Sequence, residues 1–197
     1  MTELTQAWTD YLDVLRAQAP ATHASILAPG PLDLETADQV LPSPLLPELV
    51  TWFGLHGGCT PAYHGSPLPR CGLLNLDRAI DNTEMIHEIW NLTSDVDLTS
   101  DEARTAGQTM GTWMDEYVLI AENGSGGGLF VDQRPGPLQG CVRYWDKVDA
   151  DEDPVVSPGL VPFLSDVTTS VRDLTPLPLM RAVPVVTDGV LAWENAN

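Results

Sequence analysis

The alternation of hydrophobic and polar residues predicts a helix near the beginning of the chain. Apolar side chains recur there every three or four residues, at Leu4, Trp8, Tyr11, Leu12 and Leu15. This spacing places them on one face of an amphipathic helix over residues 5–19, which Pro20 is expected to end. Comparable patterns predict four further helices, over residues 32–40, 48–56, 77–90 and 160–174.

Prolines, glycines and small polar residues mark the limits of these helices. Pro47 suits the first turn of the helix over residues 48–56, and the pair Gly57-Gly58 is expected to end that helix. Residues 92–111 are rich in Ser, Thr, Asp and Gly and have little periodicity. We therefore expect a loop there, with one helical turn over residues 101–106.

Short apolar runs separated by turn residues predict strands. Three of them follow one another closely, at residues 117–121, 128–132 and 140–145. Connections this short imply antiparallel neighbours. The dipeptide Asp188-Gly189 predicts a hairpin between residues 182–186 and 190–193, and residues 73–76 are a further short strand candidate.

These elements together predict an α+β fold. We expect one domain over residues 1–197, with a mainly antiparallel twisted sheet and helices packed around it. Apolar residues make up 43% of the 197 positions and include six tryptophans, which is more than a disordered acidic chain would carry. A hydrophobic core is therefore expected.

The charge balance narrows the classes of partner. The chain has 28 Asp and Glu against nine Lys and Arg, a formal charge of −19. Nucleic acid and anionic membranes are disfavoured, because both are bound through Lys and Arg. A basic protein is the electrostatic complement of such a chain. The single Lys147 leaves a second explanation open, since an acidic chain poor in lysine also fits a particular genome composition or a salty cytoplasm.

The expected compartment is the cytoplasm. Residues 1–6 lack the basic start and apolar run of a signal peptide, and the uncharged stretch over residues 49–69 contains glycines, prolines and histidines that a spanning helix would not. Three cysteines, Cys59, Cys71 and Cys141, cannot all pair with one another. We therefore expect reduced thiols.

Several catalytic motifs are incomplete. The glycine-rich residues 123–128 lack the Lys-Ser/Thr of a phosphate loop and are followed by a predicted strand, so a tight turn is expected. His87-Glu88 begins a zinc-protease pattern, but Asn91 replaces its second histidine. No serine lies in a Gly-x-Ser-x-Gly elbow. We expect no enzyme.

Two groups of residues resemble metal ligands without completing a site. His56, Cys59, His64 and Cys71 have suitable chemistry for zinc, but they lack a paired Cys-x-x-Cys. Loop residues and a buried thiol are the alternative interpretation. Asp149, Asp151 and Asp153 alternate as in a calcium loop, but Pro154 and Leu160 occupy its glycine and glutamate positions, so a solvated acidic loop is expected. No metal and no cofactor are expected.

Acidic residues gather in two stretches. Residues 77–116 contain ten acids against two arginines, and residues 146–153 form a second cluster beside a tryptophan. Acids near exposed aromatic side chains suit protein docking, whereas a solvated face over core tryptophans is the alternative. The candidate partner-binding residues are Glu116, Glu122, Asp132, Trp145, Asp146, Asp149, Asp151, Glu152 and Asp153.

The order of motifs over about residues 40–175 resembles the SUKH superfamily of fungal cell-wall-assembly regulators and bacterial immunity proteins. An apolar helix after Leu-Pro ends in His-Gly at residues 46–58, and a short Leu-Leu-Asn-Leu strand leads into a helix at residue 73. A tryptophan, a strand, a glycine-rich turn and a strand ending in Asp follow over residues 113–132. Gly-Cys-Val-Arg-Tyr-Trp at residues 140–145 and Ser-Pro before Phe-Leu at residues 157–164 complete the order.

This resemblance implies a binding module without catalysis. In bacteria, such proteins neutralise toxins, often nucleases or nucleic-acid deaminases, by binding them. The expected partner is a basic toxin domain that the acidic surface occludes. A regulatory scaffold that binds signalling partners without a toxin is the alternative, as is a metalloprotein built on His56, Cys59, His64 and Cys71.

Overall fold

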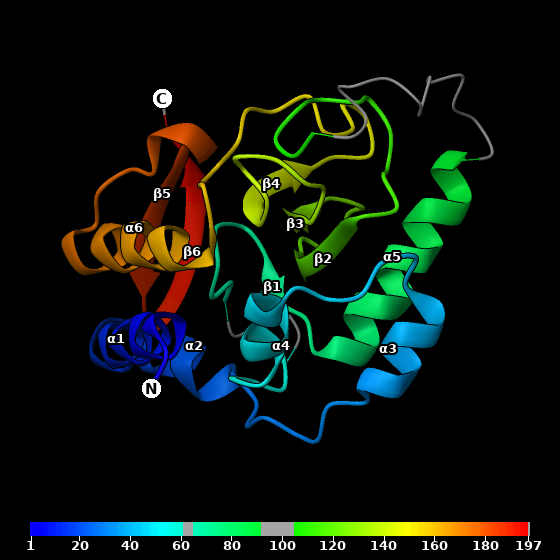
Figure 1. Ribbon diagram of the computed structural model, residues 1–197. Coiled ribbons are helices and arrows are strands. Elements are labelled where there is room, and N and C mark those ends of the chain that lie inside the picture. Colours follow the sequence, from blue (N-terminus) through cyan, green and yellow to red (C-terminus); the bar gives the residue numbers. More distant parts are fainter. Residues whose placement is uncertain (61–64, 92–104, 197) are drawn as a thin grey trace.

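The computed structural model describes residues 1–60, 65–91 and 105–196 (Figure 1). The fold is α+β, as predicted. Its helices are α1 (Glu3–Gln18), α2 (Pro20–Ser25), α3 (Leu34–Val40), α4 (Pro47–Phe53), α5 (Leu76–Asn91) and α6 (Leu160–Asp173). Its strands are β1 (Gly72–Leu73), β2 (Tyr117–Glu122), β3 (Gly128–Asp132), β4 (Cys141–Trp145), β5 (Ala182–Thr187) and β6 (Val190–Asn195). The helical turn expected over residues 101–106 falls largely outside the described residues.

The larger sheet has the order β1-β2-β3-β4, and every neighbouring pair is antiparallel. This confirms the predicted meander. Residues directly opposite each other in a ladder share a face of the sheet. One face therefore carries Val118, Val131 and Val142, which are mutual neighbours, and the other carries Phe130 opposite Arg143. The first face is mainly aliphatic and also carries Tyr144 opposite Leu129, whereas the second combines aromatic and charged side chains.

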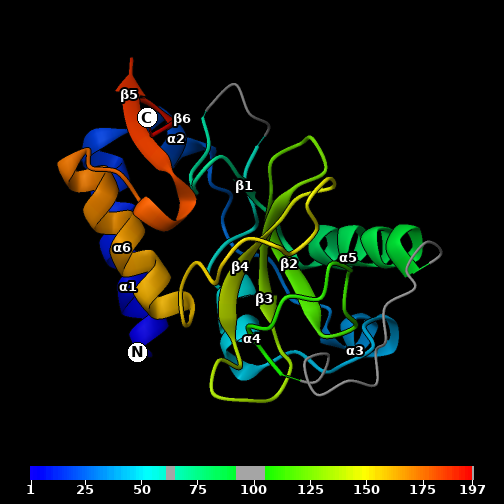
Figure 2. The same cartoon turned by 90° about the horizontal axis from the view of Figure 1, so that it is seen from above.

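The larger sheet has helices on both sides, and the second sheet lies on one of these sides. Helices α1, α2 and α6 and the β5–β6 hairpin lie on the side of β4, whereas α5 and α3 lie beyond β2 (Figures 1 and 2). Helix α1 packs against α6, and α5 packs against β2. Buried apolar side chains from both sides join in one continuous core that extends from Leu4 to Trp193. In the part of the chain that the structure describes, no helix has the length and apolar character of a membrane span.

The first helix forms as its periodicity predicts. Thr2 caps α1 by accepting a hydrogen bond from the backbone N–H of Thr5 at 3.2 Å, and the predicted apolar positions Leu4, Trp8 and Leu15 are buried. The chain then departs from the prediction. Pro20 ends α1 but also occupies the first position of the short helix α2, where its missing N–H costs nothing.

Helix α4 ends earlier than expected. Pro47 opens it as predicted, but the helix ends at Phe53 instead of residue 56. The pair Gly57-Gly58 has a different role: the N–H of Gly57 donates to the carbonyl of Leu27 at 2.8 Å, and the N–H of Leu27 donates to the carbonyl of Gly58 at 2.9 Å. A Cβ at Gly57 would lie 2.4 Å from the carbonyl oxygen of Ala28. The glycines therefore allow close backbone pairing instead of ending a helix.

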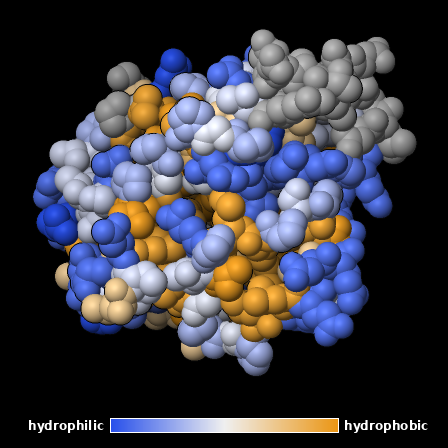
Figure 3. All heavy atoms as spheres, in the orientation of Figure 1, coloured by the Kyte–Doolittle hydropathy of each residue, from blue (hydrophilic) through white to orange (hydrophobic). Residues whose placement is uncertain are grey.

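Hydrophilic side chains cover much of the face seen in Figure 3, and hydrophobic side chains gather near its centre, over α4 and the chain beside it. Leu27, in the connection between α2 and α3, and Leu34, at the start of α3, are exposed. Such patches are common on folded proteins, whose surfaces are largely apolar by area.

The C-terminal hairpin turns at Asp188-Gly189, as its sequence predicts. Both residues have positive φ values, 52° and 78°, as a two-residue type I′ turn requires. The carbonyl of Gly189 accepts a hydrogen bond from the N–H of Ala21 at 2.9 Å, so the turn also fixes the hairpin against α2.

We expect Gly189→Ala to lower the free energy of unfolding by about 1–2 kcal/mol, because a Cβ is disfavoured at this φ. The added Cβ would also lie 3.2 Å from Cγ of Pro20. Urea denaturation measures the change. Gly30→Ala is the matched control, since Gly30 has no atom within 4 Å of an added Cβ. Equal losses of stability in Gly189→Ala and Gly30→Ala would contradict the conclusion that the turn requires glycine at position 189.

Candidate protein-binding site

An acidic turn follows strand β4. We define it as residues 146–153. Asp146 and Ala150 form an antiparallel bridge with an N–O distance of 2.9 Å, and the carboxylate of Asp146 accepts the N–H of Val148 at 2.8 Å. Val148 is 76% exposed at the tip. The exposed acids of the turn are Asp149, Glu152 and Asp153. This small surface can therefore make an apolar contact through Val148 and electrostatic contacts through the carboxylates.

Asp151 lies inside the protein, although the sequence pattern placed it in a solvated loop. Its carboxylate accepts hydrogen bonds from Arg143 Nη1 at 2.9 Å and from the hydroxyl of Tyr117 at 2.8 Å. The backbone N–H groups of Met110 and Gly111 also donate to it, at 3.0 and 2.7 Å. Both charged side chains of the pair are fully buried. The prediction that Asp151 belongs to an exposed surface is therefore wrong.

Asp132 forms a second buried ion pair. It accepts hydrogen bonds from Nε and Nη2 of Arg134 at 3.0 and 2.7 Å, and the N–H of Gly107 donates to it at 2.8 Å. The carbonyl of Gln108 accepts from both Arg134 and Arg143, at 2.6 and 3.0 Å. The two ion pairs thus hold residues 107–111 against the charged face of the sheet. Asp132 is not available to a partner either.

Aromatic rings surround these charges. The guanidinium of Arg134 lies 5.0 Å from the ring centre of Tyr117, and that of Arg143 lies 5.7 Å from the ring centre of Phe130. Burial, followed by the negative charge of Asp151, raises the pKa of Tyr117 far above its usual range. Its hydroxyl therefore keeps the proton that it donates to the carboxylate.

Trp145 is part of this aromatic layer. Its ring is 5.0 Å from that of Trp113 and 4.9 Å from that of Trp90, both in edge-on contacts, and Trp145 is buried. The expectation of an exposed aromatic anchor at Trp145 is wrong. Its contact with Trp90 has another consequence, because Trp90 is near the end of α5. The end of this helix therefore packs against the residue from which the acidic turn begins.

Helix α5 carries part of the other acidic stretch. Its acids Glu84 and Glu88 are exposed, and so are the apolar side chains of Met85 and Ile89. His87 Nε2 lies 2.6 Å from Asp115 Oδ1, which fixes the helix to the chain before β2. This pair lies within the acidic stretch over residues 77–116, and the contact between Trp90 and Trp145 links that stretch to the base of the acidic turn.

The two glutamates of the candidate set lie at opposite ends of β2. Glu122 forms an ion pair with Arg78 and accepts a hydrogen bond from Asn82 Nδ2 at 3.2 Å, so α5 neutralises it. Glu116 is half-buried, and this burial raises the pKa of its carboxyl group. Of the nine candidates, five retain accessible carboxylates outside ion pairs in the described structure: Glu116, Asp146, Asp149, Glu152 and Asp153.

The sequence reasoning missed Arg134, Arg143 and Val148. A signal existed for Arg143, because it alternates with Cys141 and Trp145 and therefore shares their face of the predicted strand. A basic residue at an inward-facing position requires an acidic partner. Nothing in the sequence indicated which of the neighbouring aspartates would supply it.

The glycine-rich residues form a tight turn, as expected. Oδ1 of Asn123 accepts hydrogen bonds from the N–H groups of Ser125 and Gly127 at 2.8 and 3.0 Å. Gly124 and Gly126 have positive φ values of 71° and 91°. The turn therefore needs its glycines for backbone geometry.

The candidate zinc residues are placed as follows. His56 is buried between the rings of Trp8 and Trp52, at 5.1 and 4.8 Å, and its Nδ1 accepts the N–H of Gly58 at 3.2 Å. Burial raises the pKa of the Cys71 thiol to about 12. His64 lies outside the described residues. Within the described ranges, no three His, Cys, Asp or Glu side chains are grouped closely enough to hold a metal ion.

We expect Asp151→Asn to lower the free energy of unfolding by about 3–5 kcal/mol, because the buried guanidinium of Arg143 loses its counter-charge. Asp149→Asn removes the same charge two residues away from an exposed position and should change stability by less than about 0.5 kcal/mol. Chemical denaturation compares the two. Amide hydrogen exchange at Met110 and Gly111 should accelerate in Asp151→Asn alone. Equal stability and equal exchange rates in the two variants would refute the role of Asp151 as an anchor.

His56 should make stability depend on pH. Burial lowers the pKa of His56 from 6.5 to about 4. Between those values the unfolded chain binds more protons than the folded one, so stability falls as pH falls through this window. The contribution is about 3 kcal/mol over the full window. Urea denaturation at pH 7 and pH 4.5 should show that the free energy of unfolding falls less between these two pH values in His56→Gln than in the unchanged protein. His23→Gln is the control, and an unchanged loss in His56→Gln would oppose the assignment.

Comparison with known proteins adds no relative from which residue roles could be transferred. No protein-family model matches the sequence, and no curated protein matches it. The features that bear on function are therefore the acidic turn, the buried pair of Arg143 and Asp151 that anchors it, and the neighbouring end of α5.

Proposed function

We propose that this protein is a non-catalytic protein-binding module of the immunity type, which neutralises a basic toxin domain by occluding it. The observation that carries the proposal is the acidic turn itself. It presents Asp149, Glu152 and Asp153 to solvent around Val148, while the buried pair of Arg143 and Asp151 fixes its base. The binding surface is the acidic turn together with the exposed residues of α5 that lie beside it.

A fixed turn favours binding for an entropic reason. Ordering a mobile loop on association costs free energy, and a loop that is already ordered avoids this cost. Asp151 receives donors from three segments of the chain, and the bridge between Asp146 and Ala150 narrows the turn above it. Partner binding therefore requires little rearrangement of the carboxylates that meet it.

The charge of the surface suits rapid encounter with a basic partner. Carboxylates gathered on one surface attract a cationic protein before contact and raise the association rate. Met85 and Ile89 on α5 and Val148 on the turn supply apolar contact area after encounter. Charge then governs how fast the complex forms, and apolar contact governs how long it lasts.

Two further points support binding over catalysis. The buried carboxylates Asp132 and Asp151 each have an arginine partner, so neither is a free acid or base. The strand, glycine turn and strand from Tyr117 to Asp132, followed by β4, stand in the order on which the resemblance to the SUKH superfamily rests. That resemblance implies binding without chemistry and a cytoplasmic partner.

The test requires the cognate partner, which is sought first among the products of the neighbouring genes. We expect the triple variant Asp149→Lys, Glu152→Lys and Asp153→Lys to slow association by about tenfold, because it reverses the charge of the turn while leaving the buried pair intact. Asp151 is excluded from the variant since its loss would unfold the anchor. Stopped-flow association at low and physiological salt measures the effect, and salt should slow the unchanged protein more than the variant.

A matched control reverses three acids on other elements: Glu35 and Asp38 of α3 and Asp173 of α6, all exposed. This variant has the same net charge as the first and should associate within about twofold of the unchanged protein. Equal slowing in both variants would assign the effect to net charge and not to the turn. An association rate that ignores salt and both variants would refute the proposal, and a neighbouring partner without toxic activity would favour the regulatory alternative.

A further inference from the structure

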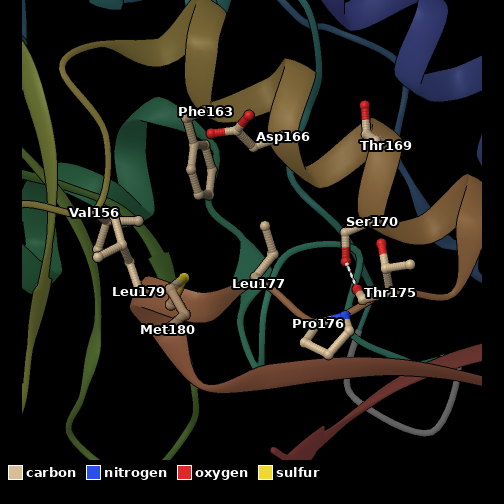
Figure 4. Close-up of a pocket in the computed structure, with 10 residues that line it drawn as sticks. All are labelled: Val156, Phe163, Asp166, Thr169, Ser170, Thr175, Pro176, Leu177, Leu179 and Met180. Carbon is tan, nitrogen blue, oxygen red and sulfur yellow. Dashed lines mark hydrogen bonds between the residues drawn. The ribbon is translucent and has the colours of Figure 1, made fainter.

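A cleft lined by apolar and polar side chains lies between α6 and the segment that leads to β5 (Figure 4). Its polar members are Asp166, Thr169, Ser170 and Thr175. Its volume is about 310 Å³. Phe163 of α6 and Leu177 of the connecting segment point into it from opposite sides, and Val156 lies at one end (Figure 4). Leu179, in the single 3-10 turn before β5, lies at the rim and is 61% exposed. The cleft therefore offers apolar surface that is open to solvent.

A second cleft of the same volume adjoins the first. Both are lined by Val156, Leu179 and Met180, so these side chains form the boundary between them. The second cleft differs in character, because Arg70 and Arg181 line it. Tyr144, Asn195 and Asp153 also line it. The first cleft thus adjoins a cleft that two arginine residues line.

The second cleft brings two arginines together. Arg134 and Arg143 are consumed in buried ion pairs, and Arg16 and Arg78 pair at the surface. Within the described ranges, neither Arg70 nor Arg181 lies within 4.0 Å of a carboxylate. Arg172 of α6 also has no ion pair in the described chain, but it lines neither of these clefts.

The guanidinium of Arg70 is nevertheless held in place. Its Nη2 donates to the carbonyl of Arg181 at 2.6 Å, which leaves its other N–H groups for a ligand. The Tyr144 hydroxyl accepts Asn123 Nδ2 at 2.8 Å and can still donate its own proton. Arg70 and Tyr144 therefore retain donors for a ligand that enters the second cleft.

We propose that the two clefts together bind a medium-chain aliphatic carboxylic acid. Its hydrocarbon chain lies against Phe163, Leu177 and Leu179, and its carboxylate accepts hydrogen bonds from Arg70 and Arg181. The argument is charge complementarity: two arginines without ion pairs in the described chain line the same cleft in a protein of charge −19, and guanidinium matches carboxylate geometry. The inference is independent of the proposed protein partner.

The probe is decanoate, kept below the concentration at which it forms micelles and titrated calorimetrically into the full chain. We expect saturable binding, with decanol and decylammonium binding about tenfold more weakly, because decanol has no charge to pair with arginine and decylammonium is repelled by it. Arg181→Gln should weaken decanoate binding by about tenfold, and Leu179→Asp should do the same. Both residues are exposed, so the fold should tolerate these changes.

Arg16→Gln is the matched control. It removes the same charge from α1, outside both clefts, and should leave the affinity within about twofold. Equal binding of decanol and decanoate would overturn the assignment of the carboxylate to the arginines. An equal loss in Arg16→Gln and Arg181→Gln, or the absence of saturable binding in the unchanged protein, would overturn the site itself.

Discussion

The buried ion pair between Arg143 and Asp151 is the interaction on which the arrangement of this surface depends. A charge removed from water is costly unless it is paired and its remaining hydrogen-bonding groups are satisfied. Asp151 meets this condition with donors from β4, from Tyr117 of β2 and from the backbone of Met110 and Gly111. One carboxylate thereby joins the sheet, the chain before β2 and the acidic turn. None of the three segments can move away without exposing an unpaired charge.

The same pair explains how an acidic turn can persist in a chain of charge −19. Asp149, Glu152 and Asp153 lie within five residues of one another and repel, which favours an open turn. The anchor at Asp151 opposes this repulsion from inside, and the aromatic layer of Trp113, Trp145 and Phe130 shields the anchor from water. The two buried arginines, Arg134 and Arg143, are therefore paired with buried aspartates, and the exposed carboxylates of the turn have no basic partner among the described residues.

Periodicity predicted most of the fold, because helices and strands are set by local patterns of burial. Periodicity failed to predict the role of residues whose contacts lie far away in the sequence. The pair Gly57-Gly58 looked like a helix end, yet its glycines allow the backbone at Leu27 to approach. The three alternating aspartates of the turn are chemically alike in sequence, and only the position of Arg143 across the turn selects Asp151 for burial. Trp145 was misread for a similar reason, since Trp90 and Trp113, which cover it, come from elsewhere in the chain.

Surfaces of opposite charge adjoin at Asp153. This residue belongs to the acidic turn and also lines the cleft that Arg70 and Arg181 line, so acidic and basic residues border the same space. Charges act over about 8 Å at physiological salt, so a protein that docks across this boundary experiences both signs. A uniformly basic partner would be attracted by the turn and repelled at the cleft, which fixes the orientation in which it binds. An anion bound between the arginines would cancel that repulsion, so occupancy of the cleft and affinity for a basic partner would rise together, as linkage between two sites requires.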